Sequence, residues 1–149
     1  MKLIQLVYIS RSTFIPLNPN NAIEPNVARI LLSSRINNAK NNLVGVLYFG
    51  DGCFFQCLEG EEAAVDLLYA KILKDSRHKQ VKILIRKSID ALSFAQWNMK
   101  YVPLEKKMTE LLRSQGHDTF DPYKFNDAMT TSALEILYSA FEFTKLDLG

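Results

Sequence analysis

Three uncharged polar side chains, those of Tyr8, Asn38 and Gln56, interrupt segments of this chain that are otherwise apolar. Each can both donate and accept a hydrogen bond, and the tyrosine is the only one of the three that is easily oxidised. Gln56 lies between Phe54 and Leu58 on one face of a strand pattern, so we expect it to be buried. A buried amide without partners costs about 1–3 kcal/mol. A polar group must therefore face Gln56.

Five segments have the composition of β-strands, and two lie between them as amphipathic helices. The expected strands are residues 3–10, 43–49, 53–60, 81–86 and 94–101. A helix over residues 27–37 presents an inward stripe of Val27, Ile30, Leu31 and Ser34, which Asn38 continues one turn later. A second helix follows Gly60 and carries the stripe Val65, Leu68, Tyr69 and Ile72. The order β-α-β-β-α-β, with one further strand, predicts an α+β, ferredoxin-like fold with both helices on one sheet face.

The other sheet face is also apolar and needs a cover of its own. Leu104, Met108, Leu111 and Leu112 predict a third amphipathic helix, and Gly116 is its expected C-cap. A fourth helix is predicted from Leu134, Leu137, Tyr138 and Phe141. We therefore expect a sheet domain over residues 1–101 and, over residues 102–149, a helical extension that covers the second face.

Composition excludes several classes of protein. A formal net charge of +2 with scattered basic residues does not favour nucleic-acid binding. Cys53 and Cys57 lie roughly 13 Å apart in an extended strand, too far for a disulfide, and the sequence shows no metal-binding spacing. The N-terminus lacks a signal peptide and no apolar run is long enough to span a membrane. We expect a cytoplasmic protein without a metal site.

Six segments together resemble the BLUF family, blue-light sensors that hold a flavin. The matching segments are residues 6–10, 37–40, 43–47, 54–60, 75–78 and 94–99, and they keep the family's order and spacing over residues 1–101. The C-terminal part is similar to the helical extension of short, stand-alone members. The resemblance implies a photoreceptor and not an enzyme.

The resemblance assigns roles residue by residue. Tyr8 matches the photoactive tyrosine, Gln56 the glutamine between it and the flavin, and Asn38 the asparagine that hydrogen-bonds the flavin ring. Trp97 and Met99 match the pair whose placement varies with light state. The other implied flavin-binding residues are Ile30, Ser34, Asn37, Arg77 and His78, the last two near the ribityl and phosphate end.

The implied mechanism is light-driven electron transfer from Tyr8 to the flavin, coupled to proton movement through Gln56. The glutamine amide is left rotated or tautomerised, and the flavin returns oxidised but red-shifted. FAD is the family's usual cofactor, although FMN also fits. Because no effector domain is fused in this sequence, we expect the signal to reach a partner protein, or to change self-association, through residues 104–143.

Other interpretations of the same residues remain open. A ferredoxin-like enzyme of the acylphosphatase kind would use Arg11, although no glycine-rich cradle accompanies it. A flavin oxidoreductase would need a dinucleotide fingerprint, which is missing. In a flavin-free interaction module, Tyr8 would be a core residue whose hydroxyl reaches the surface, Asn38 a helix C-cap, and Gln56 a residue satisfied by water.

Overall fold

A five-stranded sheet forms the centre of the molecule, and the computed structural model describes residues 2–16, 23–94, 98–102 and 106–140. The strands are β1 (Leu3–Ser12), β2 (Val44–Gly50), β3 (Cys53–Glu61), β4 (His78–Ile89) and β5 (Lys100–Val102), in the spatial order β4-β1-β3-β2-β5. The helices are α1 (Pro25–Lys40), α2 (Glu62–Leu73), α3 (Lys106–Ser114) and α4 (Asp127–Ser139), with a short 3-10 turn at Pro122–Lys124.

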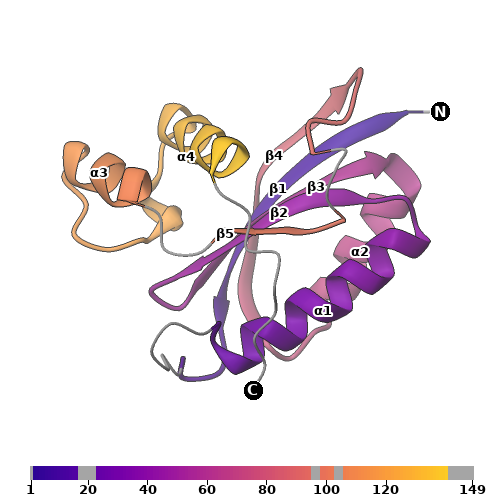
Figure 1. Cartoon of the computed structure of the whole chain (residues 1–149), viewed down its shortest axis with the longest axis horizontal. Coiled ribbons are helices and arrows are strands. Elements are labelled where there is room, and N and C mark those ends of the chain that lie inside the picture. The colour runs from indigo at the N-terminus through magenta and orange to yellow at the C-terminus, as the bar shows by residue number, and fades with distance from the viewer. Residues whose placement is uncertain (1, 17–22, 95–97, 103–105, 141–149) are drawn as a thin grey trace.

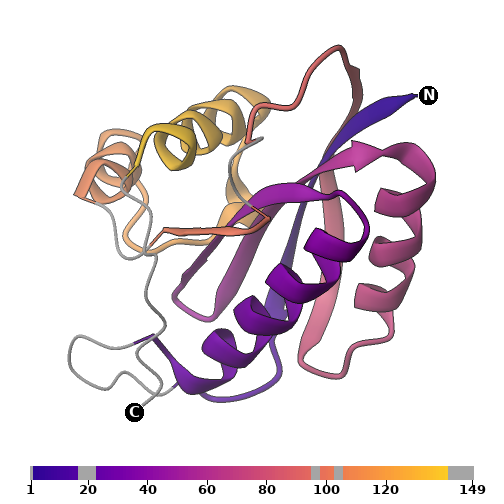
Figure 2. The ribbon, with the colours of Figure 1, turned by 45° about the vertical axis from the view of Figure 1, so that its right-hand side comes forward.

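Helices α1 and α2 cover one face of this sheet, and α3 and α4 cover the other (Figures 1 and 2). Strand side chains alternate between faces. Ile4, Leu6 and Tyr8 of β1 therefore pack under α1 and α2, whereas Val7 and Ile9 pack under α3 and α4. The same strands thus supply two apolar clusters, and the predicted α+β, ferredoxin-like fold with two further helices is confirmed.

The register of β1 and β3 fixes the pair of residues on which the site depends. The two strands run antiparallel, and Tyr8 lies directly opposite Gln56. Residues opposite each other in an antiparallel pair have Cβ atoms about 4.5–5.5 Å apart and point to the same face. The tight turn at Asp51 and Gly52, both with positive φ, joins β2 to β3 and sets the register of that neighbouring pair, in which Leu47 lies opposite Gln56.

The expected fifth strand is wrong in extent. Residues 94–101 were predicted to be extended, but β5 comprises only Lys100–Val102, and Phe94 lies in a turn. The reason is that the carbonyl oxygens of Asn98 and Met99 accept hydrogen bonds from side chains of α1 instead of from a neighbouring strand. Trp97 lies outside the described residues. Strand β4 is longer than predicted and begins at His78.

Arg11 ties the segment before α4 to the end of the sheet. Its guanidinium donates to Asp121 Oδ1 at 3.3 Å and to Gln80 Oε1 at 2.9 Å, and it lies 4.3 Å from the ring centroid of Tyr123. These contacts occupy the arginine that the acylphosphatase-like alternative would use for phosphate. Arg11 therefore has a structural role in this fold.

Among the helices of the described residues, none combines the length and apolar character needed to cross a bilayer. The cytoplasmic location remains a prediction. The division into residues 1–101 and 102–149 also remains a prediction, since the apolar cluster under α3 and α4 includes side chains from β1, β2 and β3.

Candidate functional site

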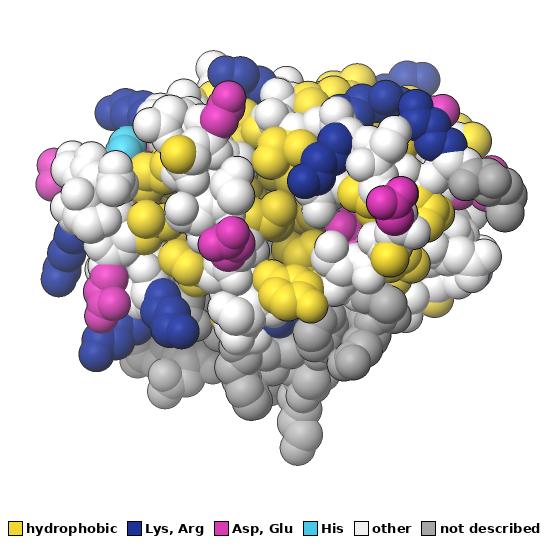
Figure 3. Space-filling model, turned by 90° about the horizontal axis from the view of Figure 1, so that it is seen from above, with side chains coloured by type: hydrophobic (Ala, Val, Ile, Leu, Met, Phe, Trp, Pro, Cys, Tyr) yellow, Lys and Arg dark blue, Asp and Glu magenta, His cyan; other side chains and the backbone are white. Residues whose placement is uncertain are grey.

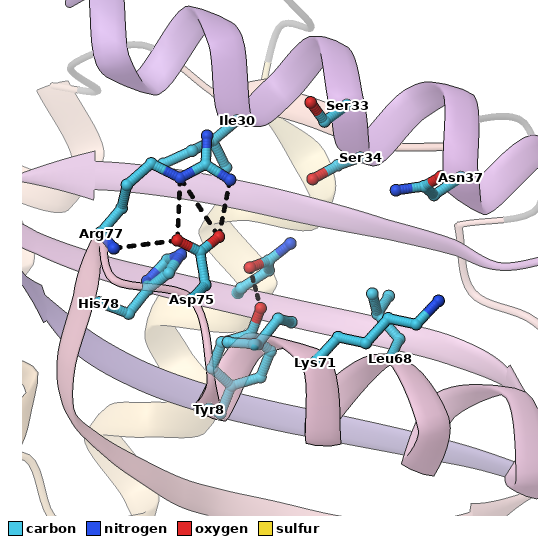
Figure 4. Close-up of a pocket in the computed structure, with 12 residues that line it drawn as sticks. Tyr8, Ile30, Ser33, Ser34, Asn37, Leu68, Lys71, Asp75, Arg77 and His78 are labelled. Carbon is cyan, nitrogen blue, oxygen red and sulfur yellow. Dashed lines mark hydrogen bonds and ion pairs between the residues drawn. The ribbon is translucent and has the colours of Figure 1, made fainter.

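A cavity of about 120 Å³ opens between α1, α2 and the sheet (Figure 4). Ile30, Ser34 and Asn37 reach it from α1, and Tyr8 and Gln56 form its floor on β1 and β3. The complete lining is Tyr8, Ile30, Ser33, Ser34, Asn37, Gln56, Leu68, Lys71, Ile72, Asp75, Arg77 and His78. Seven predicted site residues thus meet at one cavity, although they come from separate parts of the chain.

The tyrosine and the glutamine are in direct contact at the floor of this cavity. The Tyr8 hydroxyl donates a hydrogen bond to Gln56 Oε1, and both side chains are buried. Gln56 Nε2 lies 3.9 Å from the sulfur of Met99. The polar partner that a buried Gln56 requires is therefore Tyr8. The alternative in which the Tyr8 hydroxyl reaches the surface is wrong, because Tyr8 is 0% exposed.

Burial keeps the phenol of Tyr8 protonated. Desolvation raises the pKa of Tyr8 well above its usual 10.0, and Tyr69, Asp75 and Cys57 add smaller contributions in the same direction. Tyr69 also packs edge-on against Tyr8, with ring centroids 5.6 Å apart. At neutral pH the Tyr8 hydroxyl is thus a donor that carries a proton toward Gln56.

Asn38 does not line this cavity but lines a neighbouring one, which shares Asn37, Leu68 and Lys71 with it. Its side chain is 0% exposed, and Nδ2 donates to the Asn98 carbonyl at 2.7 Å. Its Oδ1 is buried without a hydrogen-bond partner among the described residues. Asn38 lies inside α1, which runs to Lys40, so the C-cap interpretation is wrong, and Asn41 is the C-cap. An orphaned buried oxygen of this kind indicates a missing donor.

The mouth of the cavity contains the run from Asp75 to His78. Arg77 pairs with Asp75 at 2.6 Å, and the side-chain hydrogen bond lowers the pKa of Asp75 and raises that of Arg77. His78 begins β4, hydrogen-bonds Ser10 Oγ at 2.7 Å and packs on the ring of Phe54. Burial lowers the pKa of His78, which favours a neutral imidazole.

Several lining residues were not predicted from the sequence. Asp75 neutralises Arg77 in the structure, and the only sequence signal was its place in the run of residues 75–78. Lys71 brings a cation to the cavity from α2, one turn before Asp75. Leu68 and Ile72 were predicted as core residues, but both line the cavity and stay half-buried.

The donor set suits a flavin ring, whose N3–H, O2, O4 and N5 alternate along one edge. Asn38 Oδ1 is an acceptor in need of an N–H, and the Gln56 amide offers one donor and one acceptor. A cavity of about 150 Å³ holds one benzene ring, so a three-ring ligand requires side chains at the mouth to move. Lys71, exposed on α2, has the length and freedom to do so, whereas Arg77 would first have to leave Asp75.

The family that matches this chain is described by a flavin ligand, for which the hydrogen-bonding groups of the site are suited. A family model described as BLUF, sensors of blue-light using FAD, matches residues 3–100. Photoactivated adenylate cyclase subunit beta from Euglena gracilis is 31% identical over 96 residues, which are 64% of this chain and 11% of that protein. The chain therefore spans only about a tenth of that cyclase subunit.

Solved structures match the C-terminal helices as well as the sheet. BlsA in its ground state is 35% identical with a TM-score of 0.86, over 99% of this chain and 94% of that chain. BlsA in its photo-activated state gives a TM-score of 0.83 at 35% identity, over 96% and 99% of the two chains. BlrB, a BLUF protein in its dark state, is 23% identical with a TM-score of 0.69, over 88% and 90%, and supports the fold alone.

Proposed function

This chain belongs to the BLUF family of sensors of blue light using FAD, and we propose that Tyr8 and Gln56 carry its photoreaction. The matched region is a flavin-binding blue-light sensor and not a catalytic domain. The observation that supports the assignment is the buried hydrogen bond from the Tyr8 hydroxyl to Gln56 Oε1. When bound, the flavin absorbs the light and serves as the transient electron acceptor.

The Tyr8–Gln56 contact links an electron to a proton. Loss of an electron makes the phenol of Tyr8 strongly acidic, and Gln56 Oε1 is already placed to accept the proton. Return of the electron restores the phenol and consumes no substrate. The Gln56 amide is the part that can remain changed, because its two ends are chemically different.

A changed Gln56 amide alters its contact with Met99. In the structure the nitrogen of the amide faces the Met99 sulfur, and the carbonyl faces Tyr8. Rotation exchanges the two ends, so a carbonyl oxygen faces a weak sulfur acceptor and no donor. This exchange disfavours the present position of Met99 and supplies the bias that a light signal requires.

We assign the remaining predicted residues to the flavin itself. Asn38 offers its unmatched Oδ1 to a ring N–H, and Ile30, Ser34 and Asn37 supply the α1 wall of the cavity. Arg77 and His78 lie at the mouth with Lys71, where cations suit the phosphates of the cofactor. FAD is the proposed cofactor because the matching family model is described as sensors of blue-light using FAD. Lys71 adds a cation at the mouth, where Arg77 is already paired with Asp75.

The absorption spectrum tests this function directly. The purified protein is expected to be yellow, to shift its flavin absorption to the red in blue light, and to recover in darkness. Heat-released cofactor is expected to have the mass of FAD. A colourless protein that does not take up added FAD or FMN would contradict the flavin site, and released FMN would contradict only the choice of FAD.

The output of the sensor is proposed to leave through the exposed face of α4. Thr131, Glu135 and Tyr138 are exposed on this helix, whereas Ala133 and Leu137 are buried against the sheet. We propose that this face of α4 contacts a partner. The partner that can be tested directly is a second copy of the same chain. Removal of α3 and α4 is unsuitable as a test, because it would uncover the apolar cluster around Val7 and Phe55.

A charge substitution on α4 tests this contact surface without uncovering the core. Glu135→Arg is expected to weaken light-dependent self-association by about tenfold, the effect of losing one interface contact. Lys40→Glu, on the exposed end of α1, is the matched control. Analytical ultracentrifugation in darkness and in light measures the change. Equal association of both variants and the original chain would exclude this face of α4.

A further inference from the structure

Two consecutive residues connect the two faces of the sheet at β5. Met99 lies in the apolar cluster under α1 and α2, where its sulfur contacts Gln56. Lys100 pairs with Val46 in the parallel β2–β5 ladder, and Val46 faces α3 and α4. Because successive strand residues point to opposite faces, the residue after the photosensitive contact projects toward the helical extension.

Lys100 is buried and bound to the end of α4. Its side chain is 1% exposed, and Nζ donates to the Tyr138 carbonyl at 2.8 Å. An ammonium group is seldom buried unless a partner compensates the loss of hydration. The free carbonyl groups at a helix C-terminus carry a partial negative charge and offer that compensation.

Within the described residues, the C-terminal turn of α4 carries one side-chain donor of its own, the Ser139 hydroxyl, which bonds the Glu135 and Ile136 carbonyls and leaves the Tyr138 carbonyl to Lys100. The last turn of α4 contains no basic residue, and its C-cap residue, Ala140, is extended (φ −72°, ψ 160°) and not left-handed. Lys100 therefore provides from a strand the cation that helices often carry in their own last turn. The position of Lys100 and the end of α4 are physically coupled through this bond.

Residues 98 and 99, which precede Lys100, are hydrogen-bonded to side chains of α1. Asn38 Nδ2 donates to the Asn98 carbonyl at 2.7 Å, and Arg35 Nε donates to the Met99 carbonyl at 3.0 Å. Residues 98–100 are thus held by α1 and Gln56 on one face and by α4 on the other. A shift of Met99 cannot leave Lys100 in place without straining one of these bonds.

The structure leaves room for α4 to respond. A cavity of about 230 Å³ lies beside the C-terminal half of the helix and is lined by Gln5, Ser93, Phe94, Leu134, Glu135 and Tyr138. Viewed from above, hydrophobic side chains gather in a hollow between the α4 side and the β4 side of the molecule (Figure 3). Close-packed interiors resist displacement, whereas a helix beside an open cavity can tilt or fray.

We propose that Lys100 is a positioning residue that transmits the state of the Gln56 amide to the C-terminal turn of α4. The inference rests on the photoreaction proposed for Tyr8 and Gln56, and it adds the connection by which that reaction reaches the surface of α4. A displaced Met99 carries Lys100 with it, and the Tyr138 carbonyl loses its ammonium partner. The last turn of α4 then opens toward the cavity.

Amide hydrogen exchange of the full chain with its flavin, in darkness and under blue light, tests this connection. In the original chain, amides of the last α4 turn are expected to exchange about tenfold faster in the light, because one charge-assisted bond is lost. Lys100→Met keeps the length of the side chain but removes the ammonium, so the turn should exchange fast in both conditions. Lys100→Arg should restore the light dependence, and Lys106→Met, exposed on α3, is the matched control.

The absorption spectrum of each variant separates this inference from the proposed photoreaction. Lys100→Met is expected to keep its flavin and its red shift, since Lys100 does not line the flavin cavity. A Lys100→Met chain that keeps the wild-type light-dependent exchange at α4 would overturn the inference. An original chain that shifts to the red without any exchange difference at α4 would overturn it too. If the original chain shows no red shift in blue light, the proposed photoreaction is refuted, and this inference is refuted with it.

Discussion

Replacing Tyr8 with phenylalanine is expected to leave the flavin bound and to abolish the red shift in blue light. The substitution removes the hydroxyl that donates to Gln56 Oε1, together with the oxidisable phenol and its proton. A positioned group that transfers a proton commonly contributes at least about 100-fold to a rate, so the yield of the red-shifted form should fall at least that far. Absorption spectra before and after illumination give this yield.

The fold should tolerate the change at Tyr8. The ring stays in the apolar cluster under α1 and α2, and the buried Gln56 Oε1 loses its donor, which should lower the free energy of unfolding by about 1–3 kcal/mol. Tyr69→Phe is the matched control, since this second tyrosine packs against Tyr8 from α2 but does not contact Gln56 in the described structure. The control should retain its red shift. A normal photocycle in Tyr8→Phe would refute the role of Tyr8.

Strand alternation explains why the centre of the site could be predicted from the sequence. A period of two fixes which residues of β1 share one face and which residues of β3 do so, and it places Tyr8 and Gln56 among the residues expected to be buried. Their roles follow from the resemblance, and their direct pairing is seen only in the assembled sheet, because no turn joins β1 to β3. Asn38 follows from helical spacing, because it continues the stripe that contains Val27 and Leu31.

Contacts that depend on the detailed path of the backbone could not be predicted. The pairing of Asp75 with Arg77 joins side chains two residues apart in the turn before β4, which no periodic pattern describes. The shortness of β5 results from hydrogen bonds between α1 side chains and the carbonyl groups of Asn98 and Met99. Sequence patterns carry no information on such tertiary competition for backbone groups.

The burial of Lys100 is a further case in which composition misleads. A lysine between Met99 and Tyr101 suggests an exposed strand position, since lysine is rarely buried. The structure buries it because α4 ends close to it, where the Tyr138 carbonyl accepts a hydrogen bond from Nζ. That helix end lies 38 residues further along the chain. Only the assembled fold shows that the charge has a partner.

Replacing Gln56 with leucine is expected to abolish the red shift while the protein remains folded and coloured. Leucine has a similar volume, but it can neither accept the Tyr8 proton nor present a different group after rotation. The buried hydroxyl of Tyr8 then loses its partner, which should lower the free energy of unfolding by about 1–3 kcal/mol. Light-induced difference spectra and urea unfolding in darkness measure the two effects separately.

Gln5→Leu is the matched control for this substitution, because Gln5 is a second buried glutamine in the same sheet. It lies on the face opposite Tyr8 and donates to Glu59 at 2.8 Å. Its loss should cost a similar amount of stability, since the buried Glu59 carboxylate loses one of its donors, but the red shift should persist. Destabilisation alone would affect both variants equally. A red shift that survives in Gln56→Leu, or disappears equally in both, would show that no proton passes through the Gln56 amide.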